Sequence, residues 1–228
     1  MTKEEFALYK SRLVANLSHE LKTPLSIIMA MSDTLMNDPE LSDEQKNKYI
    51  ERIHANANAL VQLIDDIITL HKIETQPKEL IFQKYTRAGQ LFKDVELMVL
   101  VEEHRKLTFK CGMDEFNVNQ QHMLSILVNL IQNAVDYTKS KEIKAEIRRD
   151  KGNIVISVID EGPAIPLKER EKIFERFYTI SQSRSFLRSG SGLGLPIVKH
   201  IAALYSGSVT IQESSAGGNI FTVTLQER

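Results

Sequence analysis

Apolar residues recur every three or four positions over the first 74 residues, which predicts two long helices. The first runs from about Lys3 to Met36 and ends at the turn formers Asn37–Leu41. Ser42–Gln45 matches a capping box and predicts the start of the second helix. The second helix carries a coiled-coil-like seam, made of Ile50, Ile53, Ala57, Leu60, Ile64 and Ile67. Because two helices cannot enclose such stripes, we expect a homodimer that forms a four-helix bundle.

One polar side chain of the first helix lies where the core does not need it. At about 100° per residue, His19 points away from the apolar stripe and toward solvent. Glu20 stands beside it, and Thr23 follows one helical turn later on the same face. Pro24 lies inside the helix and is expected to bend it just beyond the histidine. A solvent-facing histidine beside a carboxylate is a candidate for chemistry, because imidazole titrates near neutral pH.

After Pro77 the hydrophobic period changes to that of strands. Short β-branched or alternating segments predict strands at 80–85, 107–111, 143–149, 153–159, 208–212 and 220–225. Helical patterns lie between them, at about 87–104, 119–136, 167–175 and 194–205. The expected fold class is therefore α+β, with a helical hairpin over residues 1–76. Over residues 77–228 we expect an α/β sandwich, a sheet covered by helices on one side.

Composition excludes several classes of function. The formal net charge is −1 without a basic block, so nothing indicates electrostatic binding of nucleic acid. The lone Cys111 excludes an internal disulfide and suits a reducing compartment, and it reads as a small apolar side chain of a strand. We find neither a signal peptide nor an apolar run that approaches the roughly 18 to 20 residues of a membrane span.

Two polar signals in the second half fit a nucleotide site. Asn129 and Asn133 are four residues apart on one face of a predicted helix, and amide oxygens are usable Mg²⁺ ligands beside water and phosphate. Alternatively, this pair is surface polarity or capping. Asp160 closes a predicted strand and could accept a hydrogen bond from an exocyclic amine, while Gly162 lets the backbone turn near a ligand. Ordinary strand-end turns use the same residues.

A glycine-rich loop precedes the last predicted helix. Gly190, Gly192 and Gly194 lead into the helix that begins around Leu195, so backbone N–H groups and the helix dipole could meet phosphates there. The loop has neither the Walker pattern nor the spacing of a dinucleotide fingerprint. The polar segment before it, residues 179–189, fits either a lid over a nucleotide or a plain surface loop.

In this order, the signals resemble the catalytic core of the sensor histidine kinases over essentially all 228 residues. The resemblance implies a dimerisation and phosphotransfer domain followed by an ATP-binding domain of the gyrase, Hsp90 and MutL (Bergerat) type. The family's sequence boxes correspond to Ser18–Pro24 (H box), Asn129–Thr138 (N box), Asp160–Ile165 (first glycine box), Phe174–Tyr178 (F box) and Gly190–Lys199 (second glycine box).

By this resemblance His19 is expected to accept the γ-phosphoryl group of ATP. Glu20 would hydrogen-bond or deprotonate the imidazole, and the phosphoryl group would pass to an aspartate in the receiver domain of a response regulator. Thr23 would position water for dephosphorylation of that partner, so phosphatase activity is expected as well. The resemblance also implies a cytoplasmic portion of a membrane-anchored parent protein.

The same resemblance assigns the ATP site. Asn133 would bind Mg²⁺ with help from Asn129, Asp160 would recognise the adenine amine, and Tyr137 would line that pocket. The glycine-box residues counted with this site are Gly162, Gly190, Gly192, Gly194 and Leu195.

Three positions depart from the family pattern and keep alternatives open. Ala164 replaces a glycine of the first glycine box, while Thr179 and Asp136 stand where a basic residue is frequent. A degenerate kinase that acts mainly as a phosphatase or docking module is therefore the alternative function. A related ATPase that drives conformational change is disfavoured, because it needs no exposed histidine–glutamate pair on a dimerising hairpin.

Overall fold

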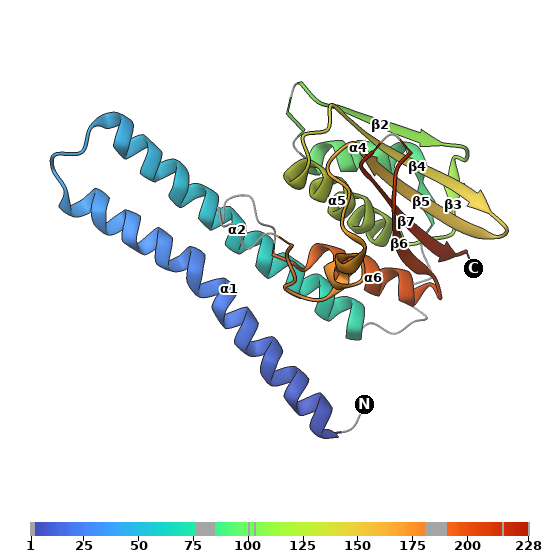
Figure 1. Cartoon of the computed structure of the whole chain (residues 1–228), viewed down its shortest axis with the longest axis horizontal. Helices are drawn as coiled ribbons and strands as arrows, with labels where there is room; N and C mark the ends of the chain where they lie inside the picture. Colours follow the sequence, from blue (N-terminus) through green and yellow to red (C-terminus); the bar gives the residue numbers. More distant parts are fainter. Residues whose placement is uncertain are drawn as a thin grey trace. The chain divides into compact units, whose positions relative to one another are not determined.

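The computed structural model describes residues 3–75, 85–99, 101–102, 104–180, 191–215 and 217–227. Its first two elements, α1 (Lys3–Asn37) and α2 (Asp43–Thr75), form an antiparallel hairpin (Figure 1). The predicted capping box is confirmed, because the Ser42 N–H donates to Gln45 Oε1 at 2.9 Å and the Gln45 N–H donates to Ser42 Oγ at 3.3 Å. Both predicted helices are therefore present. Of the described helices, none combines the length and apolar character needed to cross a membrane.

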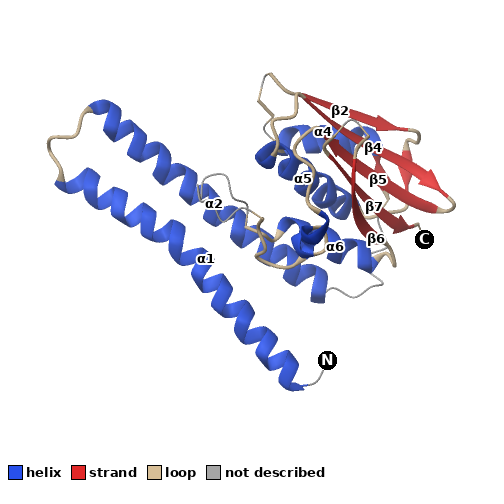
Figure 2. Ribbon diagram, viewed as in Figure 1, coloured by secondary structure: helices blue, strands red, loops and turns tan. Residues whose placement is uncertain are grey.

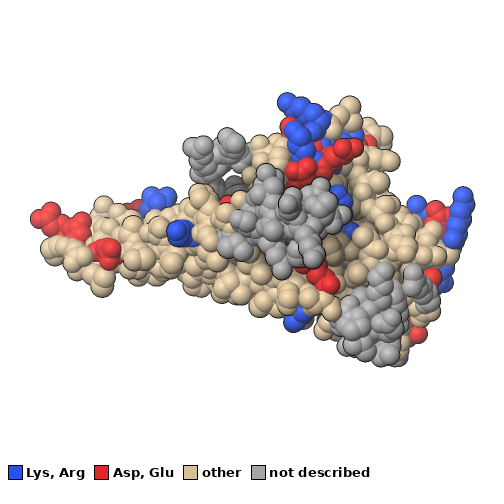
Figure 3. All heavy atoms as spheres, turned by 90° about the horizontal axis from the view of Figure 1, so that it is seen from below, with Lys and Arg blue, Asp and Glu red and all other residues tan. Residues whose placement is uncertain are grey.

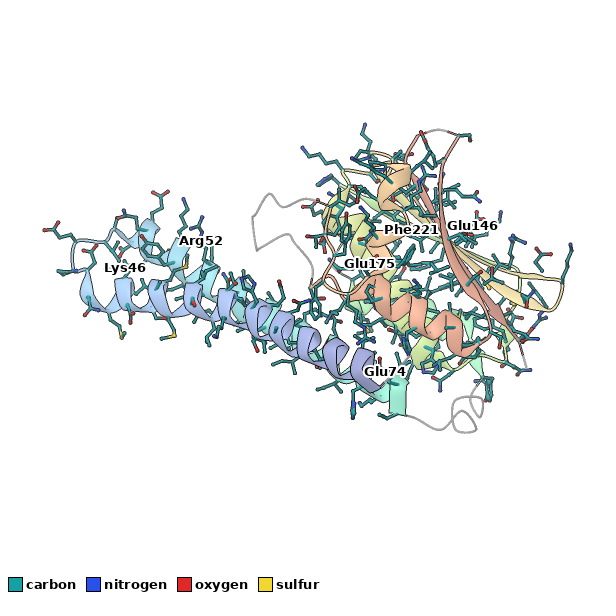
Figure 4. All side chains as sticks on the ribbon, turned by 60° about the horizontal axis from the view of Figure 1, so that its bottom comes forward. Lys46, Arg52, Glu74, Glu146, Glu175 and Phe221 are labelled. Carbon is teal, nitrogen blue, oxygen red and sulfur yellow. The ribbon has the colours of Figure 1, made fainter. Side chains whose placement is uncertain are left out.

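A single hairpin leaves much apolar surface uncovered. Its exposed large apolar side chains are Leu25, Met29, Met36, Ile50, Val61, Ile64 and Ile68. Ile50 and Ile64 belong to the seam predicted for a bundle. Charged side chains are prominent toward the turn of the hairpin, where Lys46 and Arg52 lie (Figures 3 and 4). The uncovered apolar positions are the kind that a second hairpin would bury.

The second compact unit comprises Ile68–Ile180 and Gly192–Arg228 and is built on a five-stranded sheet. Its strands are β2 (Lys106–Cys111), β4 (Glu142–Asp150), β5 (Asn153–Asp160), β6 (Ser208–Glu213) and β7 (Asn219–Gln226). Their order is β2-β4-β5-β7-β6, and all neighbours are antiparallel except β2 and β4. A small separate pair joins β1 (Thr86–Arg87) to β3 (Glu115–Phe116).

Three helices cover one face of this sheet: α4 (Ala88–Met98), α5 (Gln120–Tyr137) and α6 (Gly194–Leu204) (Figures 1 and 2). Strand residues alternate as this layering requires. Phe221 (labelled in Figure 4) and Ile147 are buried on the helix side, whereas Glu146 lies on the other face, 3.7 Å from Lys110 Nζ. The observed layers confirm the predicted α+β fold.

Two predicted helices end differently from the expectation. The helix expected over 87–104 stops at Met98, because Val99 takes an extended backbone that carries its side chain into the core. The helix expected over 167–175 is replaced by two 3₁₀ turns, η1 (Leu167–Glu169) and η2 (Lys172–Phe174). Leu167 is 78% exposed, so this segment has no continuous apolar face to support an α-helix.

The strand expected at 80–85 falls mostly on residues 80–84, which lie outside the described residues. The β1–β3 pair was not predicted, because two-residue strands are too short to show a period of two.

Candidate functional site

The predicted phosphoacceptor lies on α1, where the structure confirms its exposure. The His19 side chain is 81% exposed, and its Nδ1 lies 3.9 Å from Glu20 Oε1. The Thr23 hydroxyl donates to the main-chain oxygen of His19 at 3.1 Å, so it lies on the same helical turn. Pro24 is buried within the continuous helix. The turn therefore presents one imidazole to solvent, with a carboxylate within a few ångströms.

In the second unit, α5 and α6 bring the N box and the second glycine box together. Gly194 is the first residue of α6, and a Cβ at this position would lie 2.6 Å from Asn129 Oδ1. Only a glycine allows such a close approach without moving Asn129. The Asn129 amide is oriented by donating to Ser125 O at 2.8 Å, and half-buried Asn133 follows one turn later. The Asn129 amide oxygen thus adjoins the amino end of α6, a combination that suits phosphate with a cation.

Gly192 joins the second glycine box to the F box through main-chain atoms. Its φ is +66°, and a Cβ there would lie 2.7 Å from Phe177 Cα. The Phe177 N–H donates to the Gly192 oxygen at 2.9 Å, and Phe177 itself has a φ of 63°. Leu195 is half-buried in the first turn of α6, while Gly190 lies outside the described residues. The required φ and close approach explain why glycine stands at 192.

Asp160 ends β5 and is 2% exposed. Burial raises the pKa of its carboxyl, although the carboxylate accepts a hydrogen bond from the Gly162 N–H at 2.7 Å. A Cβ on Gly162 would lie 2.4 Å from Thr138 Cγ2, so this glycine is packed against the end of the N box. Tyr137, the residue before Thr138, is 42% exposed. The structure thus brings the first glycine box and the end of the N box together.

A buried hydroxyl pair supports the same turn. Thr138 Oγ1 lies 2.7 Å from Ser140 Oγ, and Ser140 Oγ accepts a hydrogen bond from the Glu161 N–H at 2.8 Å. Thr138 also donates to Ala134 O at the end of α5. Helix α5 and the turn after β5 are therefore connected by satisfied polar groups.

Residue Asn219 was missed by the sequence interpretation. Its carboxamide is 3% exposed and contacts Asp160 across the β5–β7 pair. The preceding Gly218 has a φ of +89°, and a Cβ there would lie 2.1 Å from the main-chain oxygen of Asp160. The Gly217–Gly218 pair was the available signal, because it indicates a tight turn against another backbone.

The positions that depart from the family pattern have local partners or open surroundings. Asp136 accepts a hydrogen bond from Gln132 Nε2 at 2.8 Å, and Ala164 and Thr179 are half-exposed. Within the described ranges, no three His, Cys, Asp or Glu side chains gather as metal ligands. Amide oxygens such as that of Asn129, together with the phosphate oxygens of a ligand, are of a kind that binds Mg²⁺.

Two family models match the chain. Residues 9–76 match the His Kinase A (phospho-acceptor) domain, and residues 118–228 match the histidine kinase-, DNA gyrase B- and HSP90-like ATPase. The sensor histidine kinase YcbM of Bacillus subtilis is 30% identical over 222 residues, which cover 94% of this chain and 71% of YcbM. The aerobic respiration control sensor protein ArcB of Escherichia coli is also 30% identical, over 95% of this chain and 28% of ArcB.

Solved structures share the fold. The Acinetobacter baumannii histidine kinase AdeS superposes with a TM-score of 0.70 at 20% identity, covering 92% of this chain and 98% of AdeS. The histidine kinase ThkA, solved in complex with the response regulator protein TrrA, gives a TM-score of 0.73 at 19% identity over 99% of this chain and 64% of ThkA. ShkA, solved in complex with AMPPNP, gives 0.64 at 23% identity over 95% of this chain and 46% of ShkA.

Proposed function

Because this chain belongs to the sensor histidine kinases, we propose that it phosphorylates its own His19 with ATP and passes the phosphoryl group to an aspartate of a response regulator. In this proposal residues 1–76 form the dimerisation and phosphotransfer domain, and residues 77–228 form the ATP-binding domain. The observation that carries the proposal is the exposed imidazole of His19 beside Glu20. Exposure leaves the imidazole accessible to a phosphoryl donor and to a partner domain, and the position of His19 in the H box Ser18–Pro24 distinguishes it from the other exposed histidines.

The chemistry of the first step follows from that turn. Glu20 lies near Nδ1, so its negative charge favours the tautomer with the proton on Nδ1. Nε2 then has a free lone pair to attack the γ-phosphorus of ATP. The Nε2–P bond forms as the bond between γ-phosphorus and the β,γ-bridging oxygen breaks, and ADP leaves. Since phosphoryl transfer requires mainly positioning and charge neutralisation, no further covalent group is required.

The ATP site proposed here uses the turn after β5, helix α5 and the amino end of α6. Asp160 would accept a hydrogen bond from the adenine amine, with Gly162 beside it and Tyr137 along the pocket. Gly192, Gly194 and Leu195 would approach the phosphates from the amino end of α6, and Gly190, which lies outside the described residues, is counted with them from the sequence. Asn133, helped by Asn129, would hold Mg²⁺, which supplies charge neutralisation at the phosphates when it is bound.

The partners follow from the hairpin. Its exposed apolar side chains, Ile50 and Ile64 among them, support a homodimer through a four-helix bundle. A receiver domain would reach His19 from solvent. Thr23 lies one turn from His19 and would orient water for dephosphorylation of that domain. The alternative, a degenerate kinase that works mainly as a phosphatase, is supported by Ala164 and by the absence of a basic side chain at 136 and 179.

The deciding experiment incubates the chain with γ-labelled ATP and Mg²⁺. We expect an acid-labile, base-stable label on the wild type and none on His19→Gln. His54→Gln is the matched control, because His54 is another exposed histidine of the hairpin, paired with Asn58 Nδ2 at 3.3 Å, and should keep the label. Unlabelled wild type that still dephosphorylates a phosphorylated receiver domain would favour the alternative function. Equal labelling of His19→Gln would refute His19 as the acceptor.

A further inference from the structure

The Asn219 side chain makes several hydrogen bonds to the turn that follows β5. Its Nδ2 donates to Asp160 Oδ1 at 3.1 Å and to Pro163 O at 3.1 Å, and approaches Asp160 Oδ2 at 3.4 Å. Its Oδ1 accepts from the Ile165 N–H at 2.8 Å. A flipped amide would place its oxygen against the carboxylate and against the Pro163 carbonyl. The hydrogen bonds therefore define one orientation of the carboxamide.

The geometry limits how many acceptor sites Asp160 has left. An ionised carboxylate offers about four lone-pair sites. The Gly162 N–H and the Asn219 amide both donate to Oδ1, at 2.7 and 3.1 Å, and the same amide lies 3.4 Å from Oδ2. These contacts use both lone-pair sites of Oδ1, so the acceptor capacity that remains is on Oδ2. Oδ2 can accept one N–H of an exocyclic amine.

The same amide also ties down the backbone of the first glycine box. Pro163 and Ile165 flank Ala164, and both of their main-chain groups bond to Asn219. Gly218 packs against the Asp160 backbone from the neighbouring strand. The turn is therefore fixed at its carboxylate and at both sides of Ala164 by one neutral side chain. A cationic side chain here would compete with a ligand amine for Asp160, whereas a neutral amide orients the carboxylate without neutralising its charge.

We propose that Asn219 is a positioning residue for nucleobase selection. It orients the remaining acceptor site of Asp160 toward the six-amino group of adenine, and it fixes the conformation of the Asp160–Ile165 turn. The proposal rests on the assignment of Asp160 to adenine recognition. In this proposal Asn219 acts on the nucleotide through Asp160. Its loss should therefore weaken binding of a base with an amine and have little effect on a base without one.

The test compares ATP with ITP, whose base carries a keto group in place of the six-amino group. Isothermal titration with Mg²⁺ gives the dissociation constants for wild type, Asn219→Ala and Asn219→Leu. We expect both variants to weaken ATP binding about 10-fold or more, the effect of losing hydrogen bonds around a buried charged group, and ITP binding less than about threefold. A leucine side chain fills nearly the same space as asparagine. The Asn219→Leu variant therefore gives the comparison if Asn219→Ala does not fold.

Tyr205→Phe is the matched control for stability. It removes a buried hydrogen-bonding hydroxyl that contacts His122 and Asn119 rather than Asp160. It should lower the melting temperature and leave the ratio of ATP to ITP affinity unchanged. The proposal is overturned if the Asn219 variants weaken ATP and ITP by the same factor. If instead Asp160 does not recognise the adenine amine, the wild type itself would bind ATP and ITP equally. The two failures are therefore distinguishable.

Discussion

Lowering the pH should destabilise the ATP-binding unit through one buried histidine, His122. Its side chain is 8% exposed in α5, and burial lowers its pKa from 6.5 to about 4. Nδ1 lies 3.0 Å from the Tyr205 hydroxyl, which accepts a hydrogen bond from the Asn119 N–H. A neutral His122 that carries its proton on Nε2 can accept the Tyr205 hydroxyl proton at Nδ1. Burial also raises the pKa of Tyr205 to about 12, which keeps that hydroxyl protonated.

The size of the effect follows from linkage. The unfolded chain binds a proton at this histidine below pH 6.5, and the folded chain does so only near pH 4. The contribution of neutral His122 to the free energy of unfolding is therefore fully present above pH 6.5. It is lost progressively as the pH falls toward 4. Between pH 7.5 and pH 5 the loss attributable to His122 is about 2 kcal/mol. A neutral asparagine cannot take up this proton, so His122→Asn should remove that pH-dependent part.

Urea unfolding at pH 7.5 and pH 5.0 measures the effect, followed by methyl NMR signals of Ile126 and Leu130 in α5. The free energy of unfolding of wild type should fall by about 2 kcal/mol more than that of His122→Asn over this interval. NMR titration of the labelled imidazole tests the cause directly. Equal losses in the two proteins, or an imidazole of His122 that titrates near 6.5, would refute the reasoning.

Two further predictions concern packing and capping. Gly194→Ala should weaken ATP binding about 10-fold or more by calorimetry, because its Cβ would lie 2.6 Å from Asn129 Oδ1. Gly89→Ala in α4 is the control, because its Cβ would meet nothing within 4 Å. It should leave ATP affinity unchanged and raise the free energy of unfolding by about 0.5–1 kcal/mol. Equal loss of ATP affinity in both variants would contradict the packing argument. Ser42→Ala should lower the stability of the hairpin by about 1 kcal/mol in thermal unfolding. Ser42→Asp should retain most of that stability, because a carboxylate can also accept the Gln45 N–H. An unchanged melting temperature for Ser42→Ala would mean that the capping box contributes nothing.

Period and alternation were sufficient to predict the long elements. Helices α1 and α2 follow from apolar spacing and from the Ser42–Gln45 motif, and β4 and β5 follow from alternation. The segment after Pro166 was mispredicted, because exposure of Leu167 depends on tertiary packing that local spacing does not report. Local pattern is a reliable guide only where one face of an element is buried along its whole length.

The candidate site also combines features that are local in sequence with contacts between distant segments. His19 and Glu20 could be proposed from the sequence because they are adjacent and His19 faces solvent, and the structure confirms that exposure. Asn219 was not, because its partner Asp160 lies 59 residues earlier and an asparagine after two glycines looks like part of a turn. The contact of Gly194 with Asn129 likewise requires the packing of α5 against α6. Contacts between distant segments arise from topology, which one sequence specifies only indirectly.

The place of β5 in the middle of the sheet has a consequence for dynamics. It is hydrogen-bonded to β4 on one side and to β7 on the other, and Asp160 is its last residue. Amide hydrogens of a central strand exchange with solvent only through nearly global opening. The end of the site assigned to the base should therefore be among the slowest-exchanging parts of the chain, with or without nucleotide. Any rearrangement during the catalytic cycle would then fall to the helices that carry the phosphate-side residues.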